Sequence, residues 1–75
     1  MYQKTLSTLA EGEMARVIDI KLKGAINSRL RSLGLIEGRK VKCLHRSTSG
    51  SISAYFICGA VIAVRKEDAD RILTE

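Results

Sequence analysis

The chain has 75 residues, 45 % of them hydrophobic, and its 13 Lys and Arg outweigh its 8 Asp and Glu to give a formal net charge of +5. This length predicts one domain, residues 1–75, with a small core. Its apolar runs are far shorter than the about 20 residues of a membrane-spanning helix, and its first residues lack the apolar region of a secretory signal, so we expect a cytoplasmic protein without membrane insertion.

The N-terminal part begins with a lead-in and continues into a strand. Leu6 and Leu9 are spaced for one helical turn, which Thr5 or Ser7 would cap. Residues 14–20 are rich in β-branched side chains and predict a strand. Both faces of this strand carry apolar groups, as expected in a small, strongly curved barrel.

Residues 25–33 predict a short helix, because Ile26, Leu30 and Leu33 recur at helical spacing and would all face the core. A helix of this length does not persist alone in water and must dock on the rest of the domain. Gly34 fits the left-handed position that often ends a helix, and Leu35 would then pack back on the last turn.

The second half of the chain predicts a hairpin over residues 40–58, with a turn at residues 47–50. On the return strand we expect Phe56 in the core, on one face with Ile52, Ala54 and Cys58. Gly59 predicts a tight reversal or bulge. Residues 60–65 are continuously apolar, which favours a strand buried on both sides.

Residues 66–73 predict a closing helical turn or two, with Ala69, Ile72 and Leu73 sealing the core. The expected fold is therefore mainly β. It is a small barrel of about five strands with a short helix after the first strand and a C-terminal helical turn. Either an SH3-like or an OB-like topology accommodates these elements.

The sequence offers few groups for catalysis or metal binding. His45 is the single histidine, and a zinc-like site would need it to meet Cys43 and Cys58. The expected hairpin separates Cys58 from Cys43 by roughly 10–13 Å along the strands, which is too far for one metal. We expect both cysteines to be small buried residues and His45 to lie on the surface near the hairpin end. We therefore predict no enzyme, no catalytic residue, no metal site and no cofactor.

The acids at residues 67, 68 and 70 suit the start of a helix without any chemistry. Basic residues gather instead in the middle of the chain. Lys40, Lys42 and Arg46 would line one strand face beside further arginines, which leaves nucleic-acid binding as an alternative. Only Tyr55 and Phe56 could act as stacking platforms there, so we consider nucleic acid an unlikely partner.

Several segments together resemble the ferrous iron transport protein A family. Its outline includes a leucine-rich lead-in with a Gly-Glu before the first strand, a central RLxxLGLxxG motif, and a closing pattern in which a strand ends in Arg. Here these correspond to Gly12-Glu13, to residues 29–38 and to residues 62–72. The hairpin loop departs from the family pattern because it has no proline, and Leu73-Thr74 stands where the family often has Val.

The resemblance implies an SH3-like barrel and a small cytosolic accessory of bacterial ferrous iron uptake. Such a protein would bind the membrane ferrous iron permease with its GTPase domain rather than perform chemistry. The outer face of the helix end would be the contact surface, through Arg29, Arg31 and Ile36, while Gly34 and Gly38 shape the turn. The alternative is a nucleic-acid-associated module, or a regulatory module like the domain at the C-terminus of iron-dependent repressors.

Overall fold

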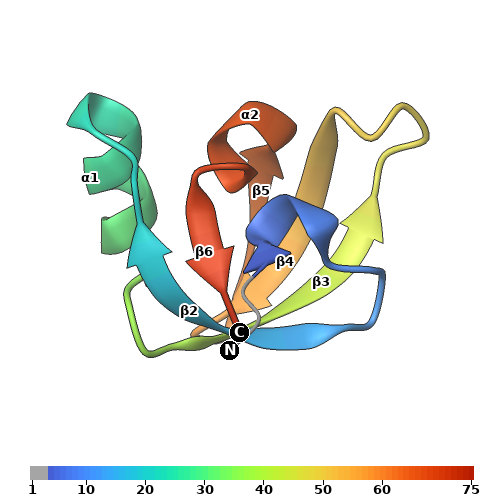
Figure 1. The fold of residues 1–75 in the computed structure, drawn as a ribbon, viewed down its shortest axis with the longest axis horizontal. Coiled ribbons are helices and arrows are strands. Elements are labelled where there is room, and N and C mark those ends of the chain that lie inside the picture. The colour runs from blue at the N-terminus through green and yellow to red at the C-terminus, as the bar shows by residue number, and fades with distance from the viewer. Residues whose placement is uncertain (1–3) are drawn as a thin grey trace.

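A computed structural model describes residues 4–75 of the chain (Figure 1). The described part contains six strands, two α-helices and one 3₁₀ turn. In chain order these elements are β1 (Lys4–Thr5), η1 (Leu6–Thr8), β2 (Met14–Ile20), α1 (Gly24–Ser32), β3 (Lys40–Arg46), β4 (Ile52–Ile57), β5 (Ala60–Arg65), α2 (Lys66–Ala69) and β6 (Ile72–Thr74).

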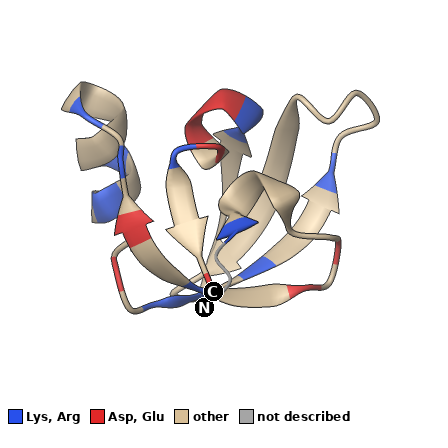
Figure 2. Cartoon of the chain, viewed as in Figure 1, with Lys and Arg blue, Asp and Glu red and all other residues tan. Residues whose placement is uncertain are grey.

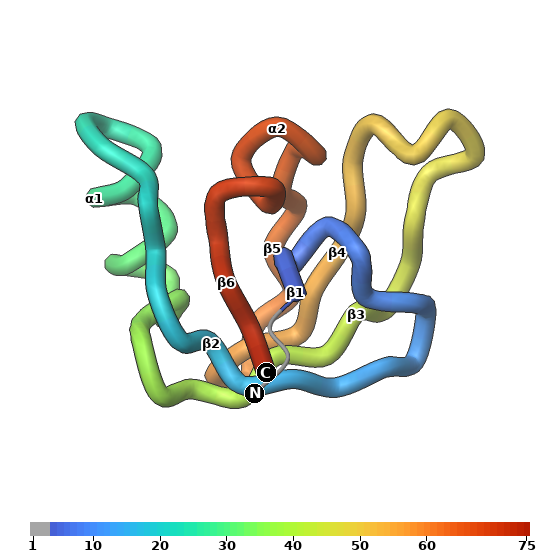
Figure 3. Tube along the Cα trace, in the orientation of Figure 1, coloured from blue at the N-terminus to red at the C-terminus, as the bar shows by residue number. Residues whose placement is uncertain are grey.

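The strands form one bent antiparallel sheet in the order β1-β6-β2-β3-β4-β5. Strand β2 joins its two halves: residues 14–16 pair with β3, and residues 17–20 pair with β6. The tube in Figure 3 shows how this brings the C-terminal strand back beside the beginning of the chain. The predicted mainly β architecture, with a helix after the first long strand, is confirmed; the short strands β1 and β6 were not anticipated.

A register shift between Val17 and Asp19 explains the imperfect alternation of β2. Val17 and Ile20 are both buried although they are three residues apart. A bulge of this kind lets one strand change the side that it presents to the core. The expectation of apolar groups on both faces of β2 is thereby accounted for.

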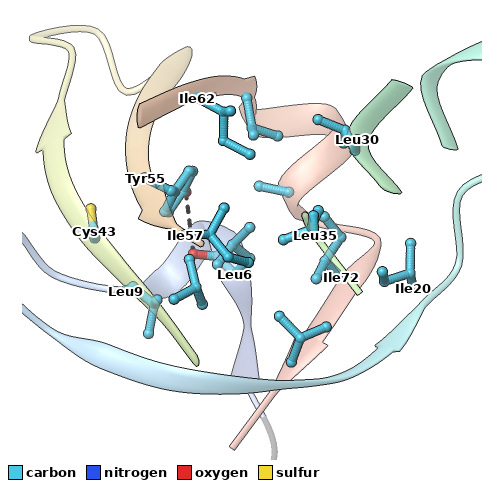
Figure 4. Close-up of a cluster of buried hydrophobic side chains, with 14 of the residues drawn as sticks. Leu6, Leu9, Ile20, Leu30, Leu35, Cys43, Tyr55, Ile57, Ile62 and Ile72 are labelled. Carbon is cyan, nitrogen blue, oxygen red and sulfur yellow. Dashed lines mark hydrogen bonds between the residues drawn. The ribbon is translucent and has the colours of Figure 1, made fainter. Parts of the chain in front are cut away.

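The core lies inside the bend of the sheet, where apolar side chains from β2, β3, β4, β5 and β6 meet η1 and α1 (Figure 4). Tyr55 is 1 % exposed, and its hydroxyl donates a hydrogen bond of 3.3 Å to the carbonyl oxygen of Leu6. Leu6 and Leu9 are buried as the lead-in predicted. The predicted cap is wrong: the turn is 3₁₀, and Thr5 and Ser7 hydrogen-bond to each other rather than to its main chain.

The expected faces of β4 and β5 were wrong. Ser53, Tyr55 and Ile57 face the core, whereas Phe56 is 44 % exposed. Both sets of alternate residues in β4 contain apolar groups, so periodicity alone did not separate them. Strand β5 lies at the end of the described sheet, and its outer face is open: Val61 is 62 % exposed, although Ile62 and Val64 are buried.

Leu33 was also misplaced. Helix α1 ends at Ser32, and Leu33 is 39 % exposed at its C-terminal end. Leu35, beyond the reversal at Gly34, is fully buried, in agreement with its predicted packing on the last turn. Ile26 packs against the core and Leu30 is buried, as predicted.

The C-terminal segment forms less helix than predicted. Helix α2 stops at Ala69, and the chain then forms β6, which pairs with β1 and β2. Ala69 and Ile72 are buried, and Leu73 is half-buried. These residues close the core as expected, but partly from a strand rather than from a helix.

Candidate functional site

The end of helix α1 is a tightly bonded reversal. The N–H of Gly34 donates to the carbonyl of Arg31, and the N–H of Leu35 donates to the carbonyl of Leu30, both at 3.0 Å. This pair of bonds is the Schellman arrangement. It needs a left-handed residue after the helix, and Gly34 supplies it with a φ of +109°.

Arg31 is held by an internal network at this helix end. Its Nη1 and Nη2 donate to the two carboxylate oxygens of Glu37, each at 2.9 Å, and its Nε donates to Oδ1 of Asn27 at 2.9 Å. The guanidinium hydrogen bonds lower the pKa of Glu37 to about 2, and the same pairing raises the pKa of Arg31. The two hydrogen bonds between Arg31 and Glu37 hold the segment between α1 and β3 against the helix end.

The three side chains expected to contact a partner differ in availability. Arg29 is exposed, and its guanidinium makes no hydrogen bond or ion pair with any residue in the described range 4–75. Arg31 is committed to Glu37. Ile36 is half-buried. Arg29 is therefore the member of the set with a free charge.

The helix end is packed against the turn between β4 and β5. Cys58 and Gly59 form this turn with φ values of +52° and +78°, as in a two-residue hairpin loop. The side chain of Cys58 lies against Gly34, and the guanidinium of Arg39 donates to its Sγ. The prediction that both cysteines are buried is wrong: Cys58 is exposed, while burial of Cys43 raises the pKa of its thiol.

The possible metal ligands are spread over the molecule. Cys43 is buried opposite Tyr55, whereas the exposed His45 has its Nδ1 3.3 Å from Oε2 of Glu11. Cys58 lies at the other end of the hairpin, beside Gly34. Within residues 4–75 no three His, Cys, Asp or Glu side chains are grouped to hold a metal ion.

The basic strand face is smaller than predicted. Lys40 and Lys42 are exposed on β3, where β2 and β3 meet at the lower edge of Figure 2. A register shift between Cys43 and His45 changes the alternation, and Arg46 is half-buried with its Nη1 3.4 Å from the carbonyl oxygen of Leu9. Tyr55 is in the core and offers no stacking platform.

A cleft between α1 and β5 was missed by sequence reasoning. It has a volume of about 470 Å³, and its lining includes Ile26, Arg29 and Leu30 from the helix and Val64 and Arg65 from the strand. Because α1 and β5 are far apart in the chain, no local pattern could have joined them. Arg29 lines this cleft and also belongs to the last turn of α1.

These features describe a small barrel with an exposed helix end and an open cleft beside it. No helix within residues 4–75 is long and apolar enough to cross a membrane. A family model described as the FeoA domain matches residues 4–75. The chain therefore belongs to the FeoA family, which is associated with ferrous iron transport.

Solved structures of similar proteins support the same grouping. The FeoA protein of Chlorobium tepidum is 30 % identical, with a TM-score of 0.87 over 93 % of this chain and 68 % of that one. The zinc complex of Stenotrophomonas maltophilia FeoA, described as a procaryotic SH3 domain protein, is 27 % identical, with a TM-score of 0.81 over 95 % of this chain and 88 % of that one. The fold is thus SH3-like.

Two further comparisons differ in coverage. Iron(II) transport protein A of Clostridium thermocellum is 27 % identical with a TM-score of 0.88, and the match covers 95 % of this chain but 44 % of that one. A manganese-dependent transcriptional repressor is 16 % identical with a TM-score of 0.85, over 96 % of this chain and 40 % of that one, and shares the fold alone. The search of curated proteins found no match.

Proposed function

We propose that this protein is a cytoplasmic accessory of ferrous iron uptake that acts by binding the cytosolic part of the membrane ferrous iron permease and its GTPase domain. The observation that carries the proposal is the FeoA-family match over residues 4–75. The Stenotrophomonas relative is described as a candidate ferrous iron transport activating factor.

The helix end of α1 is the proposed contact surface. Arg29 is exposed in the lining of the cleft between α1 and β5, which also includes Glu67 and Asp68, and its guanidinium can meet a carboxylate of the partner. Arg31 contributes by holding the turn through Glu37, and Ile36 adds a half-buried apolar group beside it. A rigid turn limits the conformational cost of association.

Titration calorimetry with the cytosolic domain of the permease from the same organism tests the proposal. Arg29→Glu should weaken binding by about tenfold or more, the loss that accompanies about 1.4 kcal/mol. Lys23→Glu is the matched control, because Lys23 is exposed at the other end of the same helix. For Arg31 the suitable change is Arg31→Gln, since a glutamate there would face Glu37.

Two results would contradict the proposal. If the unsubstituted chain does not bind the cytosolic domain, the proposed partner is wrong. If it binds and Arg29→Glu and Lys23→Glu behave alike, the partner stands but the assigned surface is wrong. An oligonucleotide titration near physiological salt, followed at Lys40 and Lys42, addresses the nucleic-acid alternative and should give no shifts.

A further inference from the structure

A row of exposed side chains crosses four strands on the outer face of the sheet. The register places Met14 opposite Lys42, Lys42 opposite Phe56, and Phe56 opposite Val61. The row therefore runs without interruption over β2, β3, β4 and β5. Its three apolar members are 59 %, 44 % and 62 % exposed in chain order. Contiguous exposed apolar groups often mark interaction sites.

Successive side chains of a strand point to opposite faces of the sheet, so the row and the core lie on opposite faces. The residues beside it along the strands, Ala15, Val41, Tyr55 and Ile62, belong to or pack against the core on the inner side. The outer face of the sheet has a hollow with a volume of about 390 Å³, and its lining residues include Met14, Lys42 and Phe56. A side chain of a partner can enter this hollow.

The charge around the hollow has one sign. Lys40 and Lys42 line it, and Arg39 reaches its edge by donating to Sγ of Cys58; among residues 4–75 no acidic residue lines it. Glu75 lines a neighbouring depression together with Arg16 and Met14. The complementary occupant therefore combines apolar side chains with carboxylates.

The spacing of the row selects the shape of that occupant. Neighbouring strands are about 4.8 Å apart, so Met14, Lys42, Phe56 and Val61 follow one another at about that interval. Side chains three and four apart on a helix repeat at about 5–6 Å. A helix lying across the strands would thus present one side chain to each member of the row.

We propose that the row Met14, Lys42, Phe56 and Val61 is a docking surface for an acidic amphipathic helix of a partner protein. The four side chains of the partner helix that contact the row would be apolar, acidic, apolar and apolar in order, and the carboxylate of the acidic one would pair with Lys42. A lipid surface fits less well, because Lys42 lies within the row rather than at its rim and because the surface is hollowed. The proposal shares no residue with the α1 contact and does not depend on it.

A designed peptide tests this surface directly. The probe is a helix-forming peptide of about 16 residues, rich in Ala and Gln, with Leu at i, Glu at i+4, Leu at i+7 and Leu at i+11. Added to the ¹⁵N-labelled chain, it should shift the amides of β2–β5 around the row. The same peptide with Lys in place of Glu should bind about tenfold more weakly or worse, which corresponds to about 1.4 kcal/mol.

Matched variants locate the contact. Phe56→Thr replaces the ring with another residue that favours strands, and it should reduce peptide affinity about tenfold. Ile52→Thr is its control, because Ile52 lies on the same strand with nearly equal exposure, 42 % against 44 %, but lies about 13 Å along the strand. Lys42→Glu should reverse the preference between the acidic and the basic peptide.

Three outcomes would overturn the proposal. One is equal loss of affinity in Phe56→Thr and Ile52→Thr. Another is tighter binding to phosphatidylglycerol vesicles than to the peptide, lost in Phe56→Thr, which would assign the surface to a membrane. The third is concentration-dependent self-association that Phe56→Thr abolishes while the peptide does not bind, which would assign it to a second copy of the chain.

Discussion

The end of helix α1 and the sheet β3–β4–β5 are built by different rules. At the helix end the deciding contacts are local: Gly34 bonds to Arg31, Leu35 to Leu30, and Arg31 to Glu37. In the sheet the side that each residue faces depends on a bulge in β3 and on the turn at Cys58. The first region can be understood from a few neighbouring residues, whereas the second requires the whole hairpin.

The two regions contact each other where the side chain of Cys58 lies against Gly34. This contact couples the locally encoded turn to the hairpin that is assembled at long range. Substitutions on either side of this contact, and on the two faces of β4, therefore test how far the difference between the regions extends.

The largest effect is expected in β4, where neighbouring residues have opposite environments. Tyr55→Ala should lower the free energy of unfolding by about 4 kcal/mol, because it empties a buried aromatic site. Phe56→Ala should cost less than about 1 kcal/mol, since its ring is half in solvent. Urea denaturation measures both. Similar losses for the two variants would contradict the assigned faces.

If Tyr55→Ala does not fold, Tyr55→Phe still tests the assignment. It removes the hydrogen bond to the Leu6 carbonyl and should cost about 1 kcal/mol.

The next effect concerns the contact between the two regions. In Gly34→Ala a new Cβ would lie 2.9 Å from Cβ of Cys58, at a φ of +109° that side chains rarely adopt. We expect a loss of about 3 kcal/mol, from backbone strain and overpacking together. Gly38→Ala is the matched control, because its φ is +89° but its Cβ would meet nothing within 4 Å. Equal losses would show that the contact with Cys58 contributes nothing.

A smaller effect is expected at the β4–β5 turn. Cys58 has a positive φ of +52°, and such two-residue turns favour Asn followed by Gly. Cys58→Asn should therefore raise the free energy of unfolding by about 0.5 kcal/mol, less than the full left-handed penalty of about 1–2 kcal/mol because the contact of Sγ with Arg39 is lost. A lower midpoint of thermal unfolding would mean that this contact outweighs the strain.

The smallest effect is a pH dependence at the pair of Arg31 and Glu37. The pKa of Glu37 is lowered from 4.5 to about 2 by Arg31. A carboxyl with a lowered pKa in the folded state stabilises it above the pKa of the unfolded chain, and this stabilisation disappears as the pH falls through the folded value. The difference in stability between the unsubstituted chain and Glu37→Gln should therefore be constant above about pH 5 and shrink steadily as the pH falls toward 2. A difference as large at pH 2 as at pH 5 would rule out the ion pair as its source.

Much of the fold followed from the sequence. The bounds of β2 and β5 and the position of α1 agree with the predicted segments, because strand and helix signals act over a few residues. The mainly β class was also predicted, and the family resemblance favoured the SH3-like over the OB-like topology. The short strand β6 was missed because three residues carry too little pattern to distinguish a strand from the end of a helix.

The candidate sites were less predictable. The sequence placed Arg29 and Arg31 at a helix end, but it did not reveal that Arg31 is occupied by Glu37 or that Arg29 lines a cleft with β5. Phe56 was expected in the core and Tyr55 was considered as a stacking platform, whereas Tyr55 is 1 % exposed and Phe56 is 44 % exposed. The cleft and the buried face of β4 depend on pairings between distant segments, whereas the pair of Arg31 and Glu37 is local and was not recognised.

The sequence by itself determined the elements whose bonds close within a turn of chain, above all the reversal at Gly34, where a left-handed residue must follow the helix. Only the tertiary structure decided which faces of β4 and β5 are buried. The physical reason is that a shift of one residue moves every side chain of a strand to the other face, and both faces here carry apolar groups. The exposed row from Met14 to Val61 exists for the same reason.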